Sequence, residues 1–165
     1  MNRIARDLGY DVLATGHNLD DEAAVLFGNT LQWSPDYLLR QGPVLESKQG
    51  LARKVKPLCR FYEREMTAYS IARGIEYIYE ECPFAEGATQ IFYKETLNQL
   101  ENTRPGIKLT FYLRFLEARQ GGELFIKREE AQLHIHPCEK CGQPTSAPGL
   151  CSFCRMLEKA DIATG

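Results

Sequence analysis

The stretch YDVLATGHNLDDEA, from Tyr10 to Ala23, joins two hydrophobic patterns of different period. Its first half, YDVLATG, is an apolar run of strand length that ends at Gly16. Asn18 then suits the cap position of a helix. The apolar residues that follow recur close to one helical face: Leu19, Ala23, Leu26, Phe27 and Leu31. The stretch therefore predicts a strand, a turn and a helix that runs to about Trp33.

The same alternation extends to both sides of this stretch. A short helix is expected over Asn2–Leu8, and a second strand at ARKVKPL, residues 52–58. A further helix, with an apolar stripe of Tyr62, Met66 and Tyr69, follows and ends at Gly74. We predict IEYIYEE, residues 75–81, to be a third strand. Alternating helices and strands are typical of a mostly parallel sheet. We therefore predict an α/β fold.

From Thr89 the pattern becomes purely helical. Apolar residues at helical spacing lie on both sides of the RPG break at residues 104–106, which predicts a helical hairpin. We expect three domains: an α/β domain over 1–88, a helical extension over 89–131 and a cysteine-rich terminal domain over 132–165.

Composition narrows the class of protein. The 165 residues are 44% hydrophobic and 25% charged, as in ordinary globular domains, and the net charge is −2. No apolar run is long enough to cross a membrane, and Met1–Leu8 lacks the apolar core of a signal peptide. We expect a cytoplasmic protein with no membrane contact. Six cysteines in such a chain favour metal or redox sites over disulfides.

Four of the cysteines have the spacing C-x2-C-x9-C-x2-C: Cys138, Cys141, Cys151 and Cys154. Two residues between paired ligands allow a tight turn around one ion, and four thiolates predict a closed, structural zinc site. A rubredoxin-like iron site and two disulfides are the alternatives. The zinc unit could serve as a recognition module or only stabilise the end of the fold.

A polar cluster follows the first predicted strand. In parallel α/β sheets ligands bind beyond the carboxyl ends of the strands, where His17, Asp20 and Asp21 are expected. A carboxylate at this place can bind Mg²⁺ that carries nucleotide phosphates. Alternatively, acidic residues in a first helical turn simply favour the helix dipole.

These segments resemble a known family. LATGHNLDDEA is similar to the second motif of the PP-loop ATP pyrophosphatases that thiolate tRNA. VKPL, YEREMTAYSIARGI, ECPF and the terminal Cys-x-x-Cys pairs then follow in the order seen in the TtuA family, which is related to TtcA and carries zinc fingers. The resemblance implies ATP-dependent replacement of a uridine 2-oxygen by sulfur in tRNA, at the T-loop 5-methyluridine or, in other relatives, at the wobble uridine.

The resemblance also implies roles for single residues. Asp21 matches the active-site aspartate, with Asp20 beside it, and Gly16 and His17 match the strand end that faces ATP and Mg²⁺. Cys82 matches one of three cysteines that bind a [4Fe-4S] cluster, although a lone cysteine is more often a small buried residue. The implied partners are tRNA, a sulfur-donor protein of the ubiquitin-like kind and a second copy of the chain.

The chain also departs from the family pattern. It contains no Ser-Gly-Gly-x-Asp-Ser phosphate loop and no earlier Cys-x-x-Cys pair for the other two cluster ligands. We therefore expect the later part of a longer sulfurtransferase, inactive alone. The alternative is a catalytically incomplete, zinc-containing module that binds tRNA or a protein partner.

Overall fold

A computed structural model describes residues 2–48, 51–78, 80, 85, 87–122 and 135–163. Its contacts divide the chain into two compact units. We call the first the helical unit, which comprises Ala14–Leu45 and Lys56–Arg128, and the second the knuckle unit, which comprises Met1–Leu13, Glu46–Val55 and Glu129–Gly165. The three sequential domains expected from the sequence remain a prediction.

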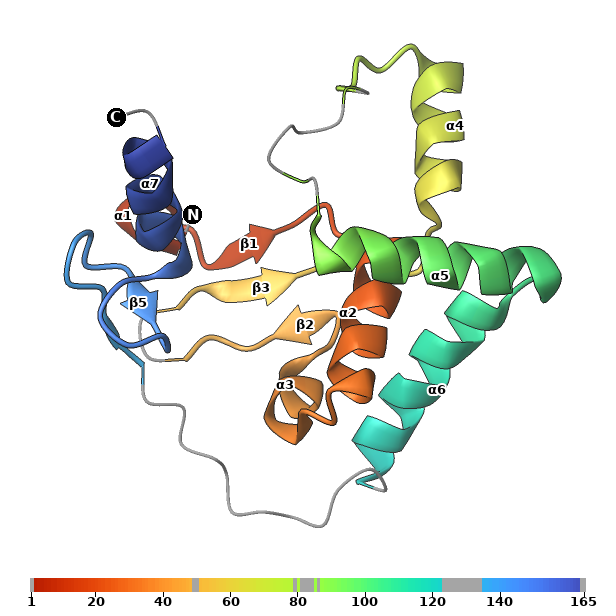
Figure 1. Ribbon diagram of the computed structural model, residues 1–165, viewed down its shortest axis with the longest axis horizontal. Coiled ribbons are helices and arrows are strands. Elements are labelled where there is room, and N and C mark those ends of the chain that lie inside the picture. The colour runs from red at the N-terminus through yellow and green to blue at the C-terminus, as the bar shows by residue number, and fades with distance from the viewer. Residues whose placement is uncertain are drawn as a thin grey trace. The chain divides into compact units, whose positions relative to one another are not determined.

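The predicted sheet is seen in part. Three short strands, β1 (Val12–Ala14), β2 (Val44–Leu45) and β3 (Arg53–Val55), form a sheet in the order β1-β3-β2. The arrows of β1 and β3 run in the same direction in Figure 1, as expected for a parallel pair. The strands predicted in YDVLATG and ARKVKPL are thus confirmed, whereas β2 was not predicted.

Helix α2 (Leu19–Leu31) begins where the sequence predicts it. The Asn18 side chain accepts a hydrogen bond from the backbone N–H of Asp21, at 3.0 Å. The Asp21 carboxylate accepts one from the N–H of Asn18, also at 3.0 Å. This reciprocal capping box satisfies two of the donors that a helix start leaves unpaired. The first residue of α2 is therefore set by a local cap, which its own sequence encodes.

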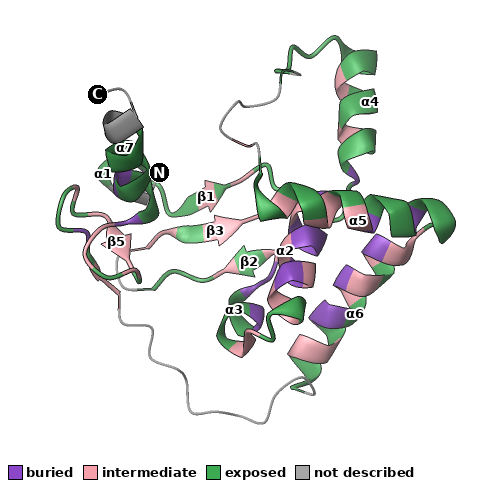
Figure 2. Ribbon diagram, in the orientation of Figure 1, coloured by how far each residue is buried: buried purple, intermediate pink, exposed green. Residues whose placement is uncertain are grey.

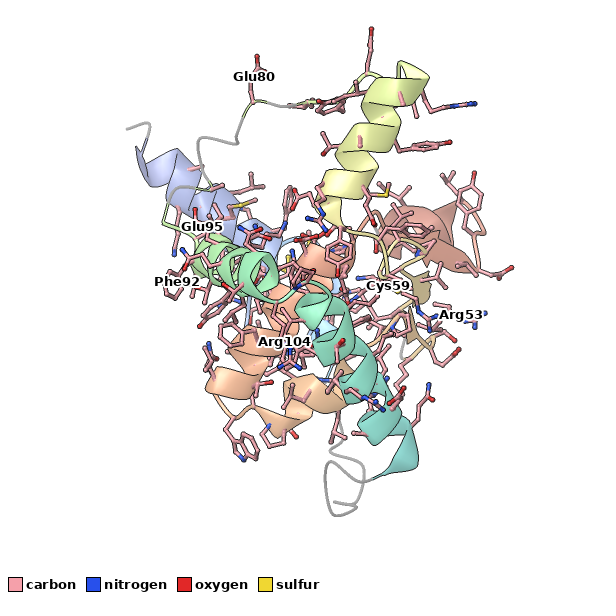
Figure 3. The ribbon with its side chains drawn as sticks, turned by 90° about the vertical axis from the view of Figure 1, so that its right-hand side faces the viewer. Arg53, Cys59, Glu80, Phe92, Glu95 and Arg104 are labelled. Atoms are coloured by element: carbon pink, nitrogen blue, oxygen red, sulfur yellow. The ribbon has the colours of Figure 1, made fainter. Side chains whose placement is uncertain are left out.

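The core of the helical unit forms around α2, which contacts α3 (Pro35–Arg40), α5 (Thr89–Thr103) and α6 (Ile107–Gly121). Figure 2 shows the buried residues concentrated on α2 and α6. Tyr112 and Leu26 are almost fully buried there. Cys59, labelled in Figure 3, packs into the same core. Burial of a leucine side chain such as Leu26 stabilises the unit by about 1.5–3 kcal/mol.

The predicted helical hairpin is confirmed as α5 and α6, which contact each other. The chain reverses at Arg104–Gly106, and Gly106 adopts a φ of 87° that favours glycine. The Glu101 carboxylate accepts hydrogen bonds from the N–H groups of Gly106, at 2.6 Å, and Lys108, at 2.9 Å. Glu101 thus caps α6 from the preceding helix.

In the middle of the chain one expectation is wrong and another holds only in part. Residues 75–78 and 80 of the IEYIYEE segment form no strand, and Ile75, Tyr77 and Ile78 are exposed. Helix α4 (Glu63–Arg73) ends at Gly74 as predicted, but none of its residues is buried. Of its expected apolar stripe, Tyr62, just before the helix, packs into the core, whereas Tyr69 is 57% exposed. Alternation in a short segment did not distinguish a strand from an extended loop.

The knuckle unit contains short elements. Helix α1 (Asn2–Asp7) precedes β1, and the antiparallel strands β4 (His136–Pro137) and β5 (Pro144–Thr145) precede α7 (Ser152–Ala163). Its buried centre is formed by cysteines. Among the helices that the structure describes, none is long and apolar enough to cross a membrane.

Candidate active site and metal centre

The acidic turn is built from Gly16–Glu22, where β1 gives way to α2. His17 Nδ1 lies 3.0 Å from the hydroxyl of Thr15; His17 is exposed and Thr15 is half-buried. A Cβ added to Gly16 would meet no atom within 4 Å, so this part of the turn is open. The structure therefore places His17 and Gly16 where a ligand could reach them.

Asp20 faces inward, unlike His17 in the same turn. Its side chain is 6% exposed and its Oδ1 pairs with the ammonium of Lys108, which is 4% exposed. Its Oδ2 accepts a hydrogen bond of 2.7 Å from the backbone N–H of Glu63. Both oxygens of Asp20 are thus occupied by protein groups, which join the start of α2 to α4 and α6.

Asp21 is more accessible, with 28% of its side chain exposed. Its Oδ2 completes the cap of α2, and its Oδ1 lies 2.7 Å from the ammonium of Lys94 on α5. Lys94 also lies 3.2 Å from a carboxylate oxygen of Glu63. Of the two predicted aspartates, Asp21 is therefore the one that a ligand could contact.

A third carboxylate, Glu22, was not singled out from the sequence. It is 1% exposed and lies 2.7 Å from the ammonium of Lys56, and the Tyr112 hydroxyl donates to it at 3.3 Å. Burial, followed by the charge of Glu22, raises the pKa of Tyr112, which remains a neutral donor. No local sequence pattern identifies Glu22, because its partners Lys56 and Tyr112 follow it by 34 and 90 positions.

The other predicted reactive residue, Cys82, lies outside the described residues, as do the rest of residues 81–84. Apart from Cys59 in the helical core, the described cysteines all belong to the terminal cluster. The described part of the chain therefore offers no second group of three cysteines, and the role of Cys82 stays a prediction.

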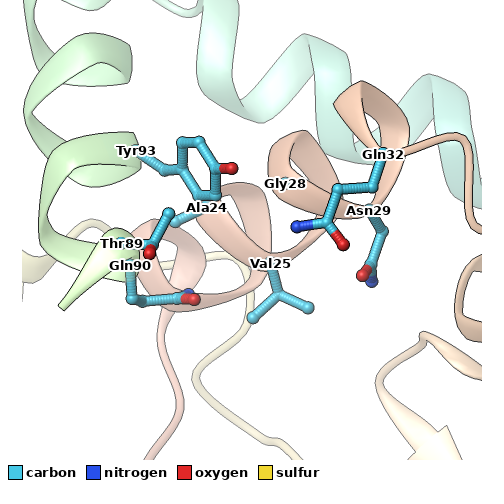
Figure 4. Close-up of a pocket in the computed structure, with 8 residues that line it drawn as sticks. All are labelled: Ala24, Val25, Gly28, Asn29, Gln32, Thr89, Gln90 and Tyr93. Atoms are coloured by element: carbon cyan, nitrogen blue, oxygen red, sulfur yellow. The ribbon is translucent and has the colours of Figure 1, made fainter.

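A shallow pocket of about 200 Å³ lies between α2 and α5 (Figure 4). Its lining is uncharged: Ala24, Val25, Gly28, Asn29, Gln32, Thr89, Gln90 and Tyr93. The Gln90 amide also donates a hydrogen bond of 3.4 Å to the backbone carbonyl of Asp21. Because no cation lines it, this pocket does not suit nucleotide phosphates.

The four predicted metal ligands come together in the knuckle unit. The sulfur atoms of Cys138, Cys141, Cys151 and Cys154 all lie within 4.8 Å of one another. A tetrahedral ion with metal–sulfur bonds of about 2.3 Å separates its sulfurs by about 3.8 Å. The Sγ atoms of Cys141 and Cys151 are 3.8 Å apart, which fits such an ion and is too long for a disulfide. The group is a metal-binding centre.

Backbone hydrogen bonds and burial change the pKa values of these thiols. The N–H of Cys151 donates to the Sγ of Cys138 at 3.2 Å, and the N–H of Gly142 bonds to the carbonyl of Cys138. Backbone donors, first Cys151 and then Cys141, lower the pKa of Cys138 to about 6. Burial raises the pKa of Cys154 to about 12. A bound cation would deprotonate the remaining thiols as well.

Comparisons with known proteins agree with these features. The chain is 51% identical to the tRNA-5-methyluridine(54) 2-sulfurtransferase of Thermus thermophilus and 46% identical to that of Pyrococcus horikoshii. The matches cover 96% and 94% of this chain but 48% and 49% of those proteins. A protein of Caenorhabditis elegans named cytoplasmic tRNA 2-thiolation protein 1 is 30% identical over 96% of the chain and 40% of its own length. No family model matches the chain.

A solved structure shares the fold. It is that of the U34-tRNA thiolase NcsA from Methanococcus maripaludis with its [4Fe-4S] cluster. The TM-score is 0.68 at 22% identity, over 96% of this chain and 48% of that one. The chain spans about half the length of the curated relatives and of the solved structure that it matches.

Proposed function

We propose that this chain, which belongs to the family of the tRNA 2-thiolation sulfurtransferases, forms part of an ATP-dependent enzyme. The proposed enzyme replaces the 2-oxygen of a tRNA uridine with sulfur. The identity of 51% over 96% of the chain to a sulfurtransferase of 5-methyluridine 54 carries the proposal. Three relatives at 41–51% identity have this name. We therefore propose 5-methyluridine 54 as the target.

In the proposed reaction, the uridine 2-oxygen attacks the α-phosphorus of ATP and pyrophosphate leaves. A sulfur nucleophile then attacks carbon 2, and AMP departs with the oxygen. Asp21 is our candidate for the carboxylate that contacts Mg²⁺ and nucleotide, because it is partly exposed at the strand end. His17 and Gly16 lie on the same turn and would face the nucleotide.

Asp20 receives a supporting role in this proposal. Its two oxygens contact Lys108 and the N–H of Glu63 inside the protein, and its side chain is 6% exposed. Contact with ATP or Mg²⁺ would require one of these buried interactions to break. We therefore assign the ligand-facing role to Asp21 and not to both aspartates.

The cofactors follow from different observations. For the terminal centre we propose zinc, because four thiolates around a closed site are typical of structural zinc. Zinc there would stabilise the knuckle unit and take no part in the reaction. For the [4Fe-4S] cluster, the name of the structural neighbour and the match of Cys82 support a cluster in the complete protein. The described residues provide no site for it, so we derive no chemical step through it.

The proposal extends to partners and location. The substrate is tRNA, as the names of the relatives state. We propose a sulfur-donor protein of the ubiquitin-like kind and a homodimer. The name of the Caenorhabditis elegans relative supports a cytoplasmic location.

The test uses the complete product of the reading frame that encodes this chain. It is purified anaerobically and incubated with tRNA, ATP, Mg²⁺ and sulfide, and 2-thiouridine nucleosides are measured by mass spectrometry. The wild type should thiolate tRNA, and Asp21→Ala should lower the rate by about 100-fold or more. Cys82→Ala should abolish it. Asp36→Ala, in the first turn of α3, is the matched control and should keep full activity.

The alternative of a binding module predicts a different result. Such a protein would bind tRNA with a steep dependence on salt but would neither consume ATP nor form thiouridine. That outcome with the complete product would overturn the proposed function. Full activity of Asp21→Ala would overturn only the role that we assign to this residue.

A further inference from the structure

The helical hairpin α5–α6 supplies two lysines to the acidic turn, one for each aspartate. Lys108 of α6 pairs with Asp20, and Lys94 of α5 lies 2.7 Å from Asp21. Glu63 connects the two pairs, since its N–H donates to Asp20 and its carboxylate lies 3.2 Å from Lys94. The proposed active-site turn thus depends on a segment that follows it by more than sixty positions in the sequence.

The two lysines differ in their freedom to move. Lys108 also donates to the side chain of Asn98 at 2.7 Å and lies 5.1 Å from the ring centre of Tyr62. With 4% of its side chain exposed, it has no path to an external ligand. Removing either member of such a pair leaves a buried charge uncompensated. The Lys108–Asp20 pair is therefore a fixed part of the fold.

Lys94 has two acceptors and is 24% exposed. Burial lowers the pKa of Lys94, but its hydrogen bonds and charge interactions with Asp21 and Glu63 outweigh burial and raise it. The ammonium therefore stays charged at neutral pH. Because Glu63 lies within 3.2 Å, Lys94 keeps a partner if Mg²⁺ or a substrate group takes the Asp21 oxygen. Asp21 can thus change partners without leaving a cation unpaired.

We infer that Lys94 is a positioning residue for Asp21 in the sulfur-transfer reaction, with Glu63 as the acceptor to which its ammonium shifts when Asp21 contacts substrate. This inference rests on the proposed function. Lys94 orients the Oδ1 side of the carboxylate, and the Asn18 N–H orients the Oδ2 side. Loss of Lys94 would let the carboxylate rotate about its remaining contact, while the hydrophobic core stays intact.

The test measures steady-state rates for three variants of the complete protein and for one control variant. Lys94→Met should lower kcat by about 10- to 100-fold, because misplacing a reacting group by about 1 Å costs this much. The KM for tRNA should stay within about twofold, because the inferred role of Lys94 is a contact with Asp21 and not with tRNA. Lys94→Arg, which keeps the charge, should recover most of the rate. Glu63→Gln should lie between Lys94→Met and the wild type.

The matched control is Arg114→Met, which removes a cation from the same hairpin. Arg114 pairs with Glu117 at the surface, is 78% exposed and does not contact the turn. It should leave kcat and KM unchanged. A kcat of Lys94→Met within twofold of an active wild type would overturn the inference. If the wild type itself forms no thiouridine, the proposed function fails instead.

A second readout does not depend on activity. The N–H of Asn18 bonds to the Asp21 carboxylate, so its amide hydrogen exchange reports the orientation of that carboxylate. Lys94→Met should speed exchange at Asn18 relative to amides in the middle of α2, and Lys94→Arg should restore it. Unchanged exchange at Asn18 in Lys94→Met would contradict a positioning role.

Discussion

The cysteine knuckle and the acidic turn both gather ionisable side chains, but by different means. All four thiols of the knuckle lie between positions 138 and 154, and local turns bring their sulfurs within 4.8 Å of one another. At the turn, Asp20 and Lys108 are 88 positions apart and meet only because α2 packs against α6. We propose that a bound metal ion stabilises the first arrangement, whereas a packed core stabilises the second.

Metal removal should have the largest effect, and it should be confined to the knuckle. Structural zinc contributes about 10–16 kcal/mol of apparent binding energy, which a centre made of cysteines cannot replace. Chelation, or Cys138→Ser, should abolish amide protection in residues 135–163 and leave α2, α5 and α6 protected. Hydrogen exchange with mass spectrometry measures this difference.

The matched control for metal binding is Cys59→Ala, which changes a buried cysteine of the helical core. It should lower stability but keep one zinc per chain, as measured by plasma emission spectroscopy. Protection of residues 135–163 that survives complete metal removal would contradict the assigned role of the centre.

The corresponding change at the turn is Lys108→Met. Breaking a buried ion pair by removing one partner costs about 3–5 kcal/mol, since Asp20 would remain buried and charged. Urea unfolding should show this loss. The double variant Asp20→Asn, Lys108→Met should recover part of the stability, because it leaves no unpaired charge. Wild-type stability in Lys108→Met would show that the pair does not support the turn.

This difference explains what the sequence could predict. The clustering of the four knuckle thiols, the cap at Asn18 and the hairpin break at residues 104–106 each depend on neighbouring residues, and the structure shows all three. The roles of Lys94, Lys108 and Glu22 depend on tertiary packing, and no local pattern marks them. The prediction of a strand from residue 75 is wrong, because the alternation of side chains does not show whether a neighbouring strand pairs with this segment.

A smaller loss of stability should distinguish the contribution of the local cap at Asn18 from that of the buried Asp20–Lys108 pair. Asn18→Ala removes the cap of α2 and should cost about 1 kcal/mol, less than the loss in Lys108→Met. Urea unfolding of both variants gives the comparison. If Asn18→Ala proved the more damaging change, local capping rather than the buried pair would stabilise the turn.

The smallest effect should appear as a dependence on pH. Burial would raise the pKa of Glu101, but hydrogen bonds from the N–H groups of Lys108 and Gly106 and from Tyr62 outweigh it and hold that pKa below its ordinary value of 4.5. A lowered pKa stabilises the fold fully above the unfolded value and loses this contribution as pH falls through the folded value. The difference in unfolding free energy between wild type and Glu101→Gln should therefore shrink below pH 4.5. A difference in unfolding free energy that increases as the pH falls would contradict the capping role of Glu101.

The central claim, membership of a sulfurtransferase that acts on 5-methyluridine 54, can be tested most directly in cells. Transfer RNA is isolated with and without the gene, and the nucleoside at position 54 is identified by nuclease mapping and mass spectrometry. We predict 2-thio-5-methyluridine in the parent, its loss on deletion and its return with the wild-type gene but not with Asp21→Ala. Undiminished 2-thio-5-methyluridine at position 54 after deletion would contradict the account.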